Sequence, residues 1–197
     1  MKIWSKWFLI LILYFYTLSA SSQTGTDPFL EKVFSAPAKF KSEFADYRTK
    51  FERKSGFEYS GLHWNNFVVV FTAHDKGVYK RNYVEYLKYL EFDEEEDEEE
   101  DANFEFQQYP AGAIIVKENF LSGNGRPMQP LSLTVMKKMP AGYDPDNGDW
   151  LYIQSDPAGN IILEGKLGDP EVHAQCAECH SNIKERDYIF STFIVPN

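Results

Sequence analysis

The chain has 197 residues, of which 43% are hydrophobic and 16% aromatic, and its formal net charge is −10 at pH 7. The acidic balance argues against nucleic acid as a partner, because the chain has no basic stripe that could displace counterions from phosphate groups. The length, less a short export segment, suits one ordinary domain.

The first 22 residues have the features of an export signal. Lys2 and Lys6 form a basic start, and residues 7–18 are an apolar run that is short for a membrane span. Small residues follow, so we expect cleavage near Ser22 and a periplasmic or secreted protein. Loss of the two lysines would change the charge from −10 to −12. An uncleaved signal that anchors the chain in the membrane is the alternative.

A helical segment is expected at residues 23–64, ahead of a main domain at 65–197. Its clearest helix spans about residues 37–51, where apolar side chains recur at helical spacing; they are Phe40, Phe44, Tyr47 and Phe51. The β-branched and aromatic run at 67–71 predicts a buried strand, and helical spacing returns over about residues 81–92.

Residues 91–101 contain ten acidic side chains in eleven positions. Such a block repels itself and cannot pack, so we expect a solvated insertion between elements. A second interpretation is that the block steers a basic redox partner by its charge. Weak divalent-cation binding is a third, although the block lacks the glycine-containing spacing of a calcium loop.

The second half of the chain reads as short strands separated by turn signals. Successive strands joined by short turns favour an antiparallel sheet, so the predicted fold class is α+β, mainly antiparallel β-sheet with a few helices. We expect a loop at 123–130 and a long turn at 140–148. The expected strands are 113–117, 131–135, 150–154, 161–164 and, at the end of the chain, 188–195.

Both cysteines of the chain fall in one motif, Cys176-Ala177-Glu178-Cys179-His180. Cys-x-x-Cys-His is the attachment sequence of c-type haem, in which the two thiols form thioether bonds to the porphyrin. Residues three apart lie on one face of a helical turn, so both sulfurs can meet one edge of the ring. The imidazole of His180 then reaches the iron as its proximal ligand. The motif therefore predicts one covalently attached haem c, on a short helix or turn between 170 and 180.

Three other interpretations of the motif compete with haem attachment. A thioredoxin-type redox pair also uses Cys-x-x-Cys, but it opens a helix after a strand and does not require the following histidine. A zinc site built from Cys176, Cys179 and His173 would lack a second cysteine pair. A disulfide between the two cysteines would close a loop too short to stabilise the chain much.

Several further blocks follow one another in the second half of the chain. They are Gly112 to Asn119, Thr134 to Lys137, Gly142 to Pro145, Gly148 to Trp150, Gly165 with Lys166, the haem motif, and Asp187 to Phe190. In order and spacing they resemble the cytochrome P-460 family, which includes the cytochromes c′-beta. The similarity covers about residues 65–190, and the amino-terminal helices match only loosely.

The resemblance implies a mainly antiparallel fold, a homodimer, and a c-type haem held by His180 with the other face of the iron open. In cytochrome P-460 a lysine is bonded to the haem ring and the protein oxidises hydroxylamine; the c′-beta relatives lack that bond and bind nitric oxide. Lys117 stands where we would place the cross-link, although a lysine that closes an apolar strand is often a solvated side chain. Lys137 and Lys138 are weaker candidates. Glu118 is the candidate distal base, but neighbours on a strand point to opposite faces unless a bulge intervenes.

The function expected from the sequence is an exported mono-haem c-type cytochrome whose open iron binds small nitrogen ligands, nitric oxide or hydroxylamine, with oxidation of hydroxylamine as a candidate activity. Electrons would pass to a redox partner protein. An apolar distal wall would favour neutral diatomic ligands, and Phe67, Phe71 and Phe120 are its candidates. The alternatives are a nitric-oxide-binding protein without turnover and a six-coordinate electron carrier, with His63, His74 or a methionine as sixth ligand.

Overall fold

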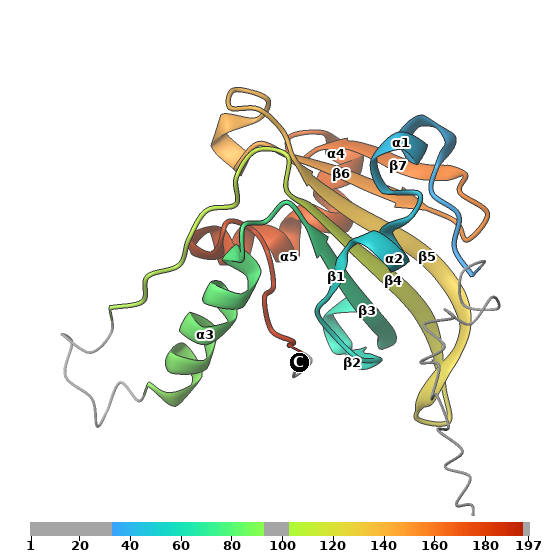
Figure 1. Ribbon diagram of the computed structural model, residues 1–197, viewed down its shortest axis with the longest axis horizontal. Helices are drawn as coiled ribbons and strands as arrows, with labels where there is room; N and C mark the ends of the chain where they lie inside the picture. Colours follow the sequence, from blue (N-terminus) through green and yellow to red (C-terminus); the bar gives the residue numbers. More distant parts are fainter. Residues whose placement is uncertain (1–32, 93–102, 195–197) are drawn as a thin grey trace, which may run out of the picture.

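The computed structural model describes residues 33–92 and 103–194 (Figure 1). The expected export signal and residues 93–101 of the acidic block lie outside the described residues. Among the residues that are described, no helix has the length and apolar character needed to cross a membrane.

The core of the fold is a seven-stranded sheet in which every pair of neighbouring strands is antiparallel. The strand order is β1-β3-β4-β5-β6-β7, and β2 also pairs with β3. This arrangement confirms the predicted mainly antiparallel fold. The strands are β1 (Glu52–Arg53), β2 (Glu58–Ser60), β3 (Asn66–Ala73), β4 (Ile114–Gly123), β5 (Arg126–Lys138), β6 (Trp150–Ser155) and β7 (Ile161–Lys166).

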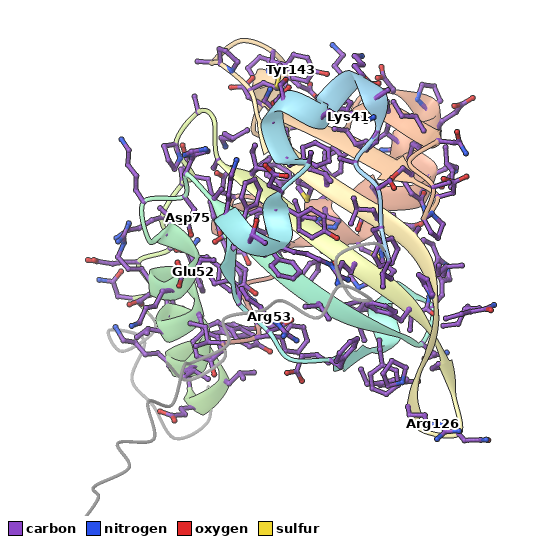
Figure 2. All side chains as sticks on the ribbon, turned by 45° about the vertical axis from the view of Figure 1, so that its right-hand side comes forward. Lys41, Glu52, Arg53, Asp75, Arg126 and Tyr143 are labelled. Carbon is purple, nitrogen blue, oxygen red and sulfur yellow. The ribbon has the colours of Figure 1, made fainter. Side chains whose placement is uncertain are left out.

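Helices are few and mostly short. The expected helix at 37–51 is divided into a turn at Ala38–Phe40, α1 (Lys41–Phe44) and α2 (Tyr47–Lys50). The helix expected at 81–92 is α3 (Val78–Glu91), whose start is capped by Asp75, labelled in Figure 2. Near the carboxyl end, α4 (Pro170–Val172), a turn of π-helix (His173–Ala177), α5 (Glu178–His180) and a 3-10 segment (Ser181–Arg186) follow one another.

Both faces of the sheet are covered. On one face, Phe40, Phe44 and Tyr47 of the amino-terminal helices pack on the sheet in one apolar cluster. The other face carries a second cluster that includes Tyr79 of α3 and Val172 of α4. Figure 1 shows α1 and α2 in front of the sheet and the red carboxyl-terminal segment behind it. The sheet is therefore buried between two layers, and the haem motif lies in the rear one.

Two expectations about the second half are wrong. Residues 123–130 are not a loop, because β4 and β5 form one long hairpin that turns at Asn124 and Gly125, with φ of 51° and 70°. Two consecutive positive φ values are the signature of a tight two-residue hairpin turn, and Asn-Gly is its preferred sequence. Arg126 lies at the tip of this hairpin (Figure 2). Residues 188–194 form no strand, since Asp187 and Tyr188 adopt left-handed backbone angles that break an extended run.

Candidate functional site

A cavity of about 630 Å³ lies between the rear face of the sheet and the carboxyl-terminal segment. Its volume is that of a typical small-molecule or cofactor site. The two cysteines and the histidine of the motif all line it, together with residues from four strands. Those from the strands include Val70 of β3, Lys117 of β4, Met136 of β5 and Tyr152 of β6.

The imidazole of His180 is fixed by one strong hydrogen bond. Its Nδ1 donates to the backbone carbonyl of Tyr188 over 2.6 Å, and the rings of Tyr152 and Phe190 pack edge-on against it. Burial, and then the charge of Lys117, lower the pKa of His180 to about 4, so the imidazole is neutral at pH 7. Donation by Nδ1 leaves the Nε2 lone pair free, which is how metal-binding histidines are commonly oriented.

The two thiols lie on the helical wall of the cavity. Cys176 is half-buried, Cys179 is exposed, and neither forms a disulfide. Burial raises the pKa of Cys176, so its thiol stays protonated at neutral pH. His173 is exposed and does not line the cavity. Within residues 33–92 and 103–194 no group of three His, Cys, Asp or Glu side chains is arranged to hold a metal ion, so the zinc interpretation has no geometric support there.

The sheet side of the cavity carries a lysine and a second histidine. Nζ of Lys117 donates to Nε2 of His63, whose Nδ1 in turn lies 2.8 Å from Oγ of Ser60. Burial lowers the pKa of Lys117 to about 7 and, together with the Lys117 charge, lowers that of His63 to about 2. His63 is therefore neutral, and much of Lys117 is a neutral amine at neutral pH.

Glu118 does not reach the cavity. It is 2% exposed on the opposite face of the sheet, where its carboxylate accepts hydrogen bonds from Tyr47 and Arg48. No bulge separates it from Lys117, because the register of β3 and β4 is continuous from Phe67 to Ala73. The expectation of Glu118 as a distal base therefore fails on geometry.

The three phenylalanines expected on the distal wall also lie on the front face of the sheet. Phe67 and Phe120 are cross-strand partners, and Phe71 is paired with Val116 in the same register. Phe120 packs edge-on against Phe34, and Phe71 packs against Tyr47. None of the three lines the cavity, because every second residue of β3 and β4 points to the side covered by the amino-terminal helices.

Other aromatic side chains take their place at the cavity. They are Tyr59, Trp64, Tyr79, Tyr86, Tyr152, Phe190 and Phe193. The segment expected as a last strand thus does cover the cavity, but as irregular chain. Asp187-Tyr188-Ile189-Phe190 was the sequence signal for this wall. For Trp64 the sequence offered none, since it follows a short turn (Gly61–His63) in a left-handed conformation.

The wall also carries polar atoms that lack a hydrogen-bond partner among the described residues. They include Nε of Arg186 and the hydroxyl of Tyr152. The Arg186 guanidinium lies 4.7 to 5.1 Å from the rings of Tyr86, Tyr89 and Phe106, and Nε is 3.3 Å from the exposed carboxylate of Glu185. A buried cation beside a largely apolar cavity suits a flat apolar ligand that carries carboxylates. The residues present therefore fit a haem.

Comparison with known families gives one result that bears on this site. The family model described as Cytochrome P460 matches residues 63–191, which include both cysteines, all the cavity residues from His63 to Phe190, and the Tyr188 carbonyl. A comparison with curated proteins found no match.

Proposed function

Since this chain belongs to the cytochrome P460 family and is therefore a haem cytochrome, we propose that it is an exported mono-haem c-type cytochrome whose iron binds a small nitrogen ligand. Cys176 and Cys179 would hold the ring through thioether bonds, and His180 Nε2 would be the proximal ligand. One observation carries the proposal: both thiols and this imidazole line a single cavity, and Nδ1 is already engaged by the Tyr188 carbonyl.

Other residues of the cavity would orient the cofactor and keep water from it. Arg186 would pair with a carboxylate of the haem, because its buried charge has only an exposed neighbour as ionic partner among the described residues. When bound, the haem would supply a redox-active iron with a position for a small ligand. The rings of Phe190 and Phe193 would exclude water from the ligand.

Lys117 would decide which branch of the family chemistry this protein performs. Its amine is largely neutral at neutral pH because burial lowers its pKa, and a neutral amine is the nucleophilic form. A bond between Nζ and a ring carbon would replace one N–H and one C–H, with two electrons passing to an oxidant such as a peroxide. Such a cross-link would favour hydroxylamine oxidation. An unmodified Lys117 would favour nitric oxide binding without turnover.

The six-coordinate electron carrier stays a second candidate because of His63. Its ring lines the same cavity, and Nε2 is held only by Lys117 among the described residues. His74 does not line the cavity and is exposed, so it is no longer a candidate sixth ligand. A homodimer and a redox partner protein are further proposals that rest on the family alone.

Spectra of the purified haem-loaded protein test the proposal. An open iron predicts a high-spin reduced spectrum that changes on addition of carbon monoxide or nitric oxide. A low-spin spectrum indifferent to both gases, which becomes high-spin in His63→Ala but not in His74→Ala, would establish the electron carrier instead. Oxidation of hydroxylamine with an artificial electron acceptor then separates the enzyme from the gas-binding protein.

A further inference from the structure

A buried ion pair stands directly behind the residue that orients His180. Nζ of Lys138 lies 2.6 Å from each carboxylate oxygen of Asp187, and the two residues are 8% and 4% exposed. The same carboxylate accepts a hydrogen bond from the backbone N–H of Tyr109 over 2.7 Å, and the Lys138 ammonium lies over the Trp150 ring at 4.9 Å. Two buried charges are tolerated only when they are paired and hydrogen-bonded in this way.

The backbone at this position is strained. Asp187 and Tyr188 have φ of 53° and 65°, in the left-handed region that costs a non-glycine residue of the order of 1 kcal/mol or more. Two consecutive residues hold this conformation only where the surroundings determine it. The indole N–H of Trp150 donates to the Asp187 carbonyl over 2.9 Å, and the ring of Tyr188 lies so close over Gly148 that a Cβ there would meet it at 2.6 Å.

The strained turn determines where the Tyr188 carbonyl points. That carbonyl is the acceptor for Nδ1 of His180 at 2.6 Å. Neither Lys138 nor Asp187 lines the cavity, so they can influence the haem only through this chain of contacts. A hydrogen bond of this kind raises the basicity of a metal-binding imidazole and, through it, alters the reduction potential of the metal.

We propose that Lys138 and Asp187 are positioning residues that press the Tyr188 carbonyl against His180 and so set the strength of the iron–histidine bond. The inference rests on the proposed function, because it takes His180 as the proximal ligand. Lys138 therefore serves the haem site from a distance, although it is not a residue that could be cross-linked to the ring.

Asp187→Asn is the first test, because it keeps the shape of the side chain and removes the charge that holds Lys138. The measurements are the iron–histidine stretching frequency of the reduced haem-loaded protein, from resonance Raman spectra, and its reduction potential. We expect the frequency to fall and the potential to rise, since a looser carbonyl leaves the imidazole a weaker donor. Trp150→Phe removes only the indole donor to the Asp187 carbonyl and should shift both quantities in the same directions by less.

Glu118→Gln is the matched control. It breaks a buried ion pair of similar burial, with Arg48, on the face of the sheet away from the haem. We expect it to lower stability and leave the frequency and potential unchanged. If Asp187→Asn, or Trp150→Phe where the first variant does not fold, loses stability without moving either quantity, the pair is merely structural and the inference is overturned. A wild-type haem that is retained in His180→Ala with an unchanged spectrum would instead overturn the proposed function.

Discussion

Lys117 and Glu118 are consecutive residues of β4 whose side chains serve opposite faces of the sheet. Nζ of Lys117 contacts His63 in the cavity, whereas the Glu118 carboxylate contacts Tyr47 and Arg48 under the amino-terminal helices. The two residues therefore have separable roles, since one belongs to the candidate haem site and the other to the stability of the front layer. Predictions about each can be tested independently.

Lys117 is expected to be joined to the haem if the protein oxidises hydroxylamine. Proteolysis of the mature haem-loaded protein should then yield the Lys117 peptide attached to the haem peptide, with a mass two hydrogens below the sum of the parts. Lys137 is a useful comparison, because its side chain pairs with Glu43 instead of lining the cavity, and its peptide should be recovered free. Recovery of a free Lys117 peptide as well would remove the cross-link.

Tyr47→Phe should lower the free energy of unfolding by about 1–3 kcal/mol, because it leaves a buried carboxylate without one of its hydrogen-bond donors. Urea unfolding measures this effect. Tyr59→Phe is the control, since Tyr59 is 55% exposed and its hydroxyl donates to Asn65 at the surface; it should change stability by less than about 0.5 kcal/mol. Equal losses in the two variants would show that the Glu118 contact contributes nothing.

The stability of the protein should carry a pH-dependent contribution from Glu118. Burial raises the pKa of this carboxyl above its ordinary value, although Tyr47 and Arg48 oppose the shift. A raised native pKa means that the folded state holds the proton more tightly than the unfolded state, so this contribution falls as pH rises from about 4.5 through the native pKa. Glu118→Gln cannot titrate there. The wild-type unfolding midpoint should therefore decline across this range relative to the variant, and parallel pH profiles would contradict the assignment.

Arg186→Gln should lower the reduction potential of the haem, because it removes a buried positive charge from the cavity wall and so favours the more positive oxidised iron. Lys184→Gln removes the same charge two residues away from an exposed position, where water and salt screen it. Potentiometric titration of both variants should show a larger fall for Arg186→Gln. Equal shifts would mean that Arg186 does not face the haem.

The sequence predicted the strands well because their residues are β-branched and aromatic, and it predicted the location of the haem motif because Cys-x-x-Cys-His has few other uses. It could not predict which face of β3 and β4 forms the cavity. The cavity face of β3 carries Val68 and Val70. The front face carries Phe67, Val69 and Phe71, and it is equally apolar because both faces are covered. Large aromatic side chains were taken as pocket residues, yet those of β3 fill the front layer.

The remaining errors have local causes. Pro127 and Pro130 suggested a loop, but they sit opposite the irregular register of β4 between Asn119 and Ser122, where a proline disrupts little. The left-handed turn at Asp187 and Tyr188 is held by Lys138 and Trp150, which lie far away in the sequence. Such tertiary contacts override local preference, so neither the end of the last expected strand nor the partner of His180 could be read from composition.

The account depends most on one haem being covalently attached to Cys176 and Cys179. Intact-mass spectrometry under denaturing conditions, on mature protein from a host that performs c-type cytochrome maturation, tests this directly. We predict the mass of the polypeptide plus one haem in the wild type and the polypeptide alone in the Cys176→Ala and Cys179→Ala double variant. A colourless wild-type protein with the mass of the bare polypeptide would contradict the account.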